Sequence, residues 1–120
     1  MKKIIVFIFV FAGINIYSQS DNQKVKKTEE INIFVAGNCN NCKKRIETAL
    51  DIKGVKLVKW NVETKDCRIV FRSDKISEKE IHETIANAGH DTKVIRASNE
   101  NYEKLDHCCQ YPRITNDENK

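Results

Sequence analysis

Residues 31–54 read INIFVAGNCNNCKKRIETALDIKG, and this segment contains the clearest structural signals of the chain. Apolar side chains at every second position before Gly37 predict a strand. From Cys42 onward the apolar residues recur at helical spacing along one face, and Gly54 is a typical helix end. That face comprises Ile46, Ala49 and Leu50. The stretch therefore predicts a strand, a loop with two cysteines and a helix.

The elements that follow are read in the same way. Residues 55–62 and 67–71 are apolar and largely β-branched, and the polar residues between them predict a hairpin. Ser77 and Glu80 form a capping box that starts a second helix. Residues 92–95 predict a short last strand.

The order of these elements is strand, helix, strand, strand, helix, strand. It predicts an α+β fold, the ferredoxin-like βαββαβ sandwich, with a four-stranded antiparallel sheet and two helices on one face. In that fold the loop after the first strand lies beside the loop after the second helix. We therefore expect residues 37–42 and 89–91 to be neighbours.

The two ends of the chain lack such periodicity. Residues 1–19 combine a positive start with an apolar run, which is the layout of a secretory signal peptide. The run is shorter than the roughly 20 residues that span a bilayer, so an uncleaved anchor is the weaker alternative. Residues 20–30 predict a linker, 31–96 the domain and 97–120 a polar, cysteine-containing tail. The mature protein is then periplasmic or secreted.

Composition excludes several classes of function. The net charge of +4 is mild, without the clustered basic face and interleaved aromatics that nucleic-acid binding uses. The sequence shows no nucleophile paired with a base, no paired carboxylates and no phosphate loop. We therefore expect that the protein is not an enzyme and does not bind nucleic acid.

The chain has five cysteines, and an odd count in an exported protein leaves at least one thiol outside intramolecular disulfides. Cys39 and Cys42 form one pair, and Cys108 and Cys109 another. Cys67 lies on the same face of its predicted strand as the apolar residues Ile69 and Phe71, which indicates a buried core residue.

These features resemble the heavy-metal-associated domain family, the module of copper chaperones, mercuric-ion-binding periplasmic proteins and metal-exporting ATPases. The resemblance covers roughly residues 30–96. It rests on residues 35–42 leading into a helix, on Gly54 before the second strand and on residues 88–91 after the second helix. One departure is a loop that is one residue shorter than usual and lacks the family's methionine, which packs beneath the loop.

The resemblance implies that Cys39 and Cys42 bind a soft metal ion. Two thiolates can meet such an ion from opposite sides, and soft ligands select Cu(I), the metal we expect first. Hg(II), Ag(I), Zn(II) and Cd(II) are alternatives, although two cysteines alone would hold Zn(II) poorly. We expect Cys42, at the predicted helix start, to be the more readily ionised thiol.

The sequence leaves open whether residues other than Cys39 and Cys42 also bind the metal ion. His90 lies in the facing loop and is either a third ligand or an exposed histidine. Cys108 and Cys109 form a second metal site, a disulfide with the first pair, or a structural bridge elsewhere.

Two other predictions concern residues beside the expected site. Trp60 is expected in the core and His82 on the surface. Lys43, Lys44 and Arg45 either balance the charge of the metal site and steer an acidic docking partner, or form a solvated helix face.

The sequence thus predicts an exported monomer that captures a soft metal ion and passes it between donor and acceptor proteins such as a transporter. A mercuric-ion-binding protein would use the same site. The main alternative is a thiol-disulfide redox protein, since a Cys-x-x-Cys at a helix start also serves that chemistry. Asn40 and Asn41 between the cysteines, and Pro112 in the tail as the only proline, disfavour it. A structural exported domain with all cysteines in disulfides is disfavoured by the odd count.

Overall fold

The computed structural model describes residues 27–113. The predicted leader, residues 1–19, lies outside the described residues, as do residues 114–120 of the tail. Within the described part of the chain, no helix has the length and apolar character needed to cross a membrane.

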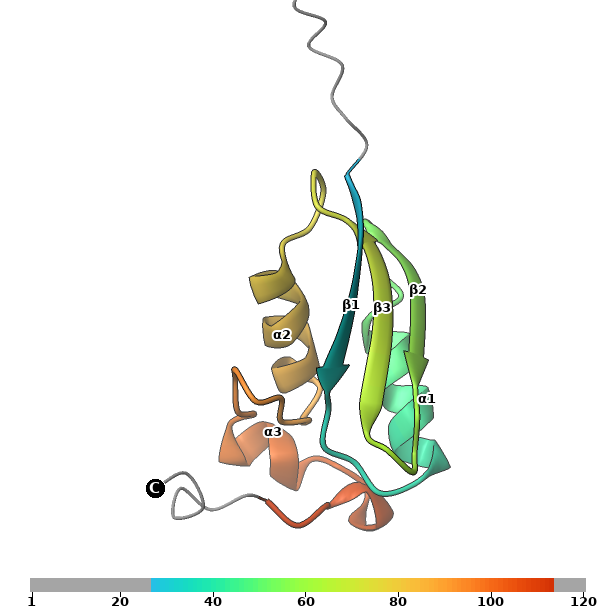
Figure 1. Ribbon diagram of the computed structural model, residues 1–120. Coiled ribbons are helices and arrows are strands. Elements are labelled where there is room, and N and C mark those ends of the chain that lie inside the picture. The colour runs from blue at the N-terminus through green and yellow to red at the C-terminus, as the bar shows by residue number, and fades with distance from the viewer. Residues whose placement is uncertain (1–26, 114–120) are drawn as a thin grey trace, which may run out of the picture.

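The sheet has three antiparallel strands (Figure 1), β1 (Thr28–Phe34), β2 (Val55–Trp60) and β3 (Asp66–Arg72), in the order β1-β3-β2. The first strand begins at Thr28, inside the segment that the sequence predicts as a linker.

The prediction of a fourth strand at 92–95 is wrong. Thr92 makes a single bridge with Val35, the residue that follows β1. Its hydroxyl accepts hydrogen bonds from the backbone N–H groups of Val94 and Ile95, at 3.2 and 3.1 Å. These bonds turn the chain back on itself, so it leaves β1 after one residue.

Two longer helices cover the sheet, α1 (Asn40–Ala49) and α2 (Glu78–Asn87). The capping box of α2 is confirmed, because the Ser77 hydroxyl accepts from the Glu80 N–H and the Glu80 carboxylate accepts from the Ser77 N–H. The first helix packs against both β2 and α2.

The core lies between the helices and one face of the sheet. Cys67, Ile69 and Phe71 alternate along β3, and all three are buried. They share one cluster with Ile46 of α1 and Ile85 of α2. The α+β antiparallel architecture with two helices on one face is therefore observed, with one strand fewer than predicted.

The described part of the tail, residues 97–113, is folded, which corrects the prediction of a patternless segment. It contains α3 (Asn99–Glu103), capped by the Ser98 hydroxyl, and a 3-10 turn, η1 (His107–Cys109). Leu105 and Tyr111 are buried in the main core cluster. As Figure 1 shows, the tail returns under the domain to the loop between β1 and α1.

Candidate metal centre

The cysteine loop is fixed by the loop that follows α2. The backbone N–H of Ala36 donates to the carbonyl oxygen of Asp91 at 2.9 Å, and Nδ1–H of His90 donates to the carbonyl oxygen of Ala36 at 2.7 Å. The predicted proximity of residues 37–42 and 89–91 is confirmed.

Trp60 supports the same loop from the sheet side. It is buried as predicted, and its indole Nε1–H donates to the carbonyl oxygen of Val35 at 2.9 Å. A Cβ added at Gly37 would lie 2.9 Å from the Trp60 ring, so glycine lets the loop approach the indole. The indole thus packs beneath a loop that lacks the family's methionine.

The first cysteine pair stands at the start of α1. Cys39 is the N-cap residue and is partly exposed, whereas Cys42 lies inside the first turn and is buried. Their sulfur atoms are 3.7 Å apart. The backbone N–H of Asn38 donates to the Cys42 sulfur at 3.3 Å.

The helix start acts on Cys39, which corrects the prediction made for Cys42. The backbone N–H of Cys42 is the main group that lowers the pKa of the Cys39 thiol to about 7. Slight burial opposes this shift, and the N–H of Asn41 adds to it. Because the helix begins at Asn40, the unpaired N–H groups of its first turn face the residue just before it.

The tail brings two more thiols to this pair. The Cys39 sulfur lies 3.9 Å from the Cys109 sulfur, which in turn lies 4.0 Å from that of Cys108. The sulfur atoms of Cys39, Cys108 and Cys109 all lie within 4.8 Å of one another. Burial, and then the neighbouring Cys42, raise the pKa of the Cys109 thiol. All five cysteines, the fifth being Cys67, are free thiols.

The side chain of Asn41 joins the loop to the tail. Its amide Nδ2–H donates to the Cys108 sulfur at 3.2 Å. The Cys39 thiol donates to the carbonyl oxygen of Cys108 at 3.5 Å. Asn41, which lies between Cys39 and Cys42 in the sequence, therefore bonds to the Cys108 thiol of the second pair.

Sequence reasoning missed the residues that fasten the tail. The Tyr111 hydroxyl accepts from the Asp91 N–H at 2.8 Å and donates to the carbonyl oxygen of Gly89 at 2.9 Å. The Arg113 guanidinium forms two hydrogen bonds with the Asp91 carboxylate, at 2.8 and 3.1 Å. These contacts join residues about 20 positions apart in the sequence, so no local periodicity predicts them.

His90 is buried, so the alternative of an exposed histidine is wrong. Since its Nδ1 proton goes to Ala36, Nε2 carries the lone pair, and this atom is buried without a hydrogen-bond partner. Burial lowers the pKa of the imidazole. Its role as a metal ligand stays a prediction, because within residues 27–113 the grouping of ligand atoms consists of cysteines alone.

Two other sequence expectations are settled by burial. His82 is buried and hydrogen-bonded through Nδ1 to the Thr92 hydroxyl at 2.7 Å, so the prediction of a surface position is wrong. Cys67 is buried as predicted, and burial raises the pKa of its thiol to about 12.

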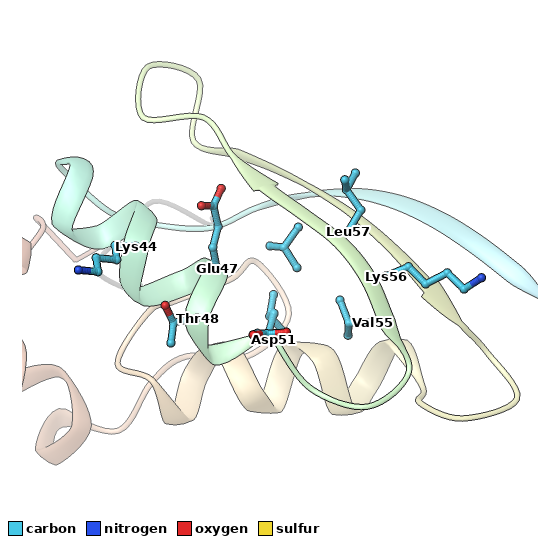
Figure 2. Close-up of a pocket in the computed structure, with 9 residues that line it drawn as sticks. Lys44, Glu47, Thr48, Asp51, Val55, Lys56 and Leu57 are labelled. Atoms are coloured by element: carbon cyan, nitrogen blue, oxygen red, sulfur yellow. The ribbon is translucent and has the colours of Figure 1, made fainter.

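The basic residues after the first pair have separate roles. The Lys43 ammonium bonds to the Glu47 carboxylate at 2.6 Å and to the Trp60 carbonyl oxygen at 2.8 Å, so it ties α1 to β2. Arg45 lies 3.7 Å from Asp106 of the tail. Lys44 is exposed beside a hollow of about 300 Å³ between α1 and β2 (Figure 2). No cysteine lines that hollow, so it is separate from the thiol cluster.

Comparisons with known proteins agree with this geometry. Residues 33–91 match the heavy-metal-associated domain. Among solved structures, the CopZ metallochaperone is 26% identical with a TM-score of 0.51, over 53% of this chain and 98% of that one. Oxidized MerP from Ralstonia metallidurans CH34 is 25% identical with a TM-score of 0.53, over 56% of this chain and 96% of that one.

A copper binding domain from HMA7, a P-type ATPase, is 26% identical with a TM-score of 0.52, over 56% of this chain and 92% of that one. No curated protein matches the chain. The fold and the thiol loop define a metal-binding α+β domain. Residues 33–91 belong to the heavy-metal-associated domain family, and the folded tail lies beyond the matched segment.

Proposed function

We propose that the protein captures a soft metal ion, Cu(I) first, through Cys39 and Cys42 and hands it to a second protein. The observation that carries this proposal is the pair of free thiols 3.7 Å apart at the start of α1. Soft thiolates favour soft d10 ions over hard cations. Hg(II) and Ag(I) suit the same donors.

The exposure of the two thiols supports hand-over. Cys42 is buried while Cys39 is partly exposed. A partner can therefore displace Cys39 first, while Cys42 still binds the ion. In the exchange, one partner thiolate bonds to the ion as the bond between Cys39 and the ion breaks, and a second partner thiolate then replaces Cys42. Each released sulfur remains a thiolate or takes up a proton. The ion keeps its oxidation state throughout.

We further propose that the protein is exported, periplasmic or secreted, and monomeric, and that its partner is a metal donor or acceptor such as a transporter. The leader-like composition of residues 1–19 supports export. The exposed ammonium of Lys44, one helical turn from the thiol loop, is suited to an acidic docking face.

The test is anaerobic competition of the reduced protein against a coloured Cu(I) chelator. We expect wild type to remove Cu(I) from the chelator, and Cys39→Ser and Cys42→Ser each to lose this ability. Cys67→Ala is the matched control, because Cys67 is a core thiol on β3. If Cys39→Ser competes as well as wild type, the proposal is wrong.

A redox role is the second candidate, favoured by the 3.9 Å distance between the Cys39 and Cys109 sulfurs. It predicts catalysis of insulin disulfide reduction in the presence of a small thiol. We expect no such activity above the rate of the small thiol alone.

A further inference from the structure

The tail holds its thiols beside the first pair by contacts that need no metal ion. Tyr111 and Arg113 flank the C-terminal side of η1, and both bond to Asp91 in the loop that follows α2. Cys109 is fully buried in the core cluster. The sulfurs of Cys39, Cys108 and Cys109 thus lie within 4.8 Å of one another, with the Cys42 sulfur 3.7 Å from that of Cys39, which reduces the ordering cost of using them together as ligands.

The distances between sulfur atoms indicate how many of them one ion would engage. For a metal–sulfur bond of about 2.3 Å, two sulfurs on opposite sides of an ion are about 4.6 Å apart, three in a plane about 4.0 Å and four in a tetrahedron about 3.8 Å. The distances are 3.7 Å for Cys39–Cys42, 3.9 Å for Cys39–Cys109 and 4.0 Å for Cys108–Cys109. These three distances match a set of three or four ligands better than a linear pair. Cys39, Cys108 and Cys109 form the closest group, and Cys42 adjoins it through Cys39.

Resting on the function proposed above, we propose that Cys108 and Cys109 complete a four-thiolate site with Cys39 and Cys42, and that this site binds divalent d10 ions of the Zn(II) and Cd(II) class. Zn(II) and Cd(II) are poorly held by two cysteines and well held by four in a tetrahedron. Four thiolates leave a net charge of −2 around a divalent ion and −3 around Cu(I), so the full set favours the divalent ion.

Polar groups around the sulfurs are arranged to stabilise the deprotonated ligands. The Asn38 N–H bonds to the Cys42 sulfur at 3.3 Å, and the Asn41 amide to the Cys108 sulfur at 3.2 Å. Such donors behind a ligand hold its orientation and spread its charge. In each pair one thiol is buried, Cys42 in the first and Cys109 in the second, so the partly exposed Cys39 and the exposed Cys108 form the entrance.

The test uses Cd(II) as the probe on the reduced, purified protein. The chemical shift of bound ¹¹³Cd reports how many thiolates surround the ion, and competition with a chelator reports affinity. We expect wild type to bind one Cd(II) with the shift of all-thiolate coordination. In the Cys108→Ser/Cys109→Ser double variant the resonance should move upfield. Its affinity should fall by more than the roughly 10- to 100-fold that loss of a residue behind the ligands costs.

Two further variants keep the result interpretable. Cys67→Ala should keep the wild-type shift and affinity, because Cys67 is a buried thiol of β3 that lies outside the group of ligand sulfurs. Cys108→Ser changes an exposed thiol, so it should leave the fold intact while moving the resonance upfield. The same shift and affinity in wild type and in both tail variants would overturn the four-thiolate site.

The outcome is separable from that of the proposed function. If the double variant loses Cd(II) but still takes Cu(I) from the chelator, both proposals stand. If wild type binds Cu(I) and not Cd(II), the four-thiolate site is wrong and the Cys39–Cys42 function remains. If Cys39→Ser keeps its Cu(I) affinity, the proposed function is wrong whatever Cd(II) does.

Discussion

The sulfur atoms of Cys39 and Cys109 lie 3.9 Å apart, although 70 positions separate the two residues in the chain. They share one environment and differ in protonation. The N–H groups of the helix start lower the pKa of the Cys39 thiol, whereas burial raises that of Cys109. Near neutral pH the cluster therefore holds a partly ionised thiol at Cys39 beside a protonated one at Cys109.

Alkylation should reveal this difference. In the metal-free, reduced protein, we expect the rate of Cys39 modification by iodoacetamide to reach half of its maximum near pH 7, because the thiolate is the reactive form and the Cys39 pKa is about 7. Peptide mass spectrometry over a pH series measures the modified fraction at each cysteine.

Cys67 is the internal control of that experiment. Its thiol is buried and has a pKa of about 12, so it should stay unmodified while the protein is folded. A Cys39 rate that rises only around pH 8.5, the ordinary value for a cysteine, would show that the helix start does not stabilise the thiolate.

The hydroxyl of Tyr111 should be a main fastening of the tail. Tyr111→Phe removes an acceptor from the Asp91 N–H and a donor from the Gly89 carbonyl. Leaving buried polar groups unpaired costs about 1–3 kcal/mol of unfolding free energy, which urea denaturation of the metal-free protein would measure.

Tyr102→Phe is the matched control, since it also removes one hydroxyl from the tail. That hydroxyl donates a single hydrogen bond, to the Tyr111 carbonyl oxygen, and its side chain is only partly buried. We expect a smaller loss, about 0.5–1.5 kcal/mol. Equal losses in the two variants would contradict the bridging role of Tyr111.

The sequence was sufficient for the elements whose side chains repeat. The alternation in β3 and the helical stripe ending at Leu50 are local patterns, and the Ser77–Glu80 capping box spans one turn. Such signals require no knowledge of distant partners. The proximity of the two loops followed from the order of elements alone.

The remaining features depend on distant or single contacts. The Thr92 hydroxyl turns the chain where the sequence predicts a strand, and it also forms a hydrogen bond with the buried imidazole of His82. Over residues 97–113 the tail has one five-residue helix and one 3-10 turn, and its docking depends on the bonds of Tyr111 and Arg113 to Asp91. The error over which thiol is activated came from placing the helix start at Cys42 instead of Asn40.

Gly37 should be required for the shape of the cysteine loop. In Gly37→Ala, the new Cβ would lie 2.9 Å from Cζ2 of Trp60 and 3.1 Å from Cβ of Cys42. Overpacking of this kind costs about 1–3 kcal/mol, and relief by moving Cys42 would change the Cys39–Cys42 geometry. We expect lower stability in urea and weaker Cu(I) competition.

Asn38→Ala controls for a general effect of changing the loop. Asn38 is exposed, and its contact with the Cys42 sulfur comes from the backbone N–H, which alanine retains. It should keep wild-type Cu(I) competition. If Gly37→Ala behaves as Asn38→Ala does, the close approach of the loop to Trp60 is not needed.

His90 should make the stability of the metal-free protein depend on pH. Burial and the nearby Arg45 lower the pKa of its imidazole below the ordinary 6.5, while the bond to Ala36 and the charge of Asp91 oppose the shift. The unfolded chain therefore takes up a proton near pH 6.5 that the folded protein refuses. This contribution to stability is complete above that pH, and is lost as the pH falls toward the folded pKa, by at most about 1.4 kcal/mol per pH unit.

Urea unfolding of wild type and His90→Gln at pH 7.5 and 5.5, with a chelator present, would measure this contribution. Glutamine can still donate to the Ala36 carbonyl oxygen and does not titrate. Carboxylates such as Glu30, Asp74 and Glu80 titrate in both proteins, so their effect cancels in the comparison. We expect wild type to lose more stability than the variant between the two pH values. An equal loss would mean that the buried imidazole accepts its proton as readily in the folded protein as in the unfolded chain.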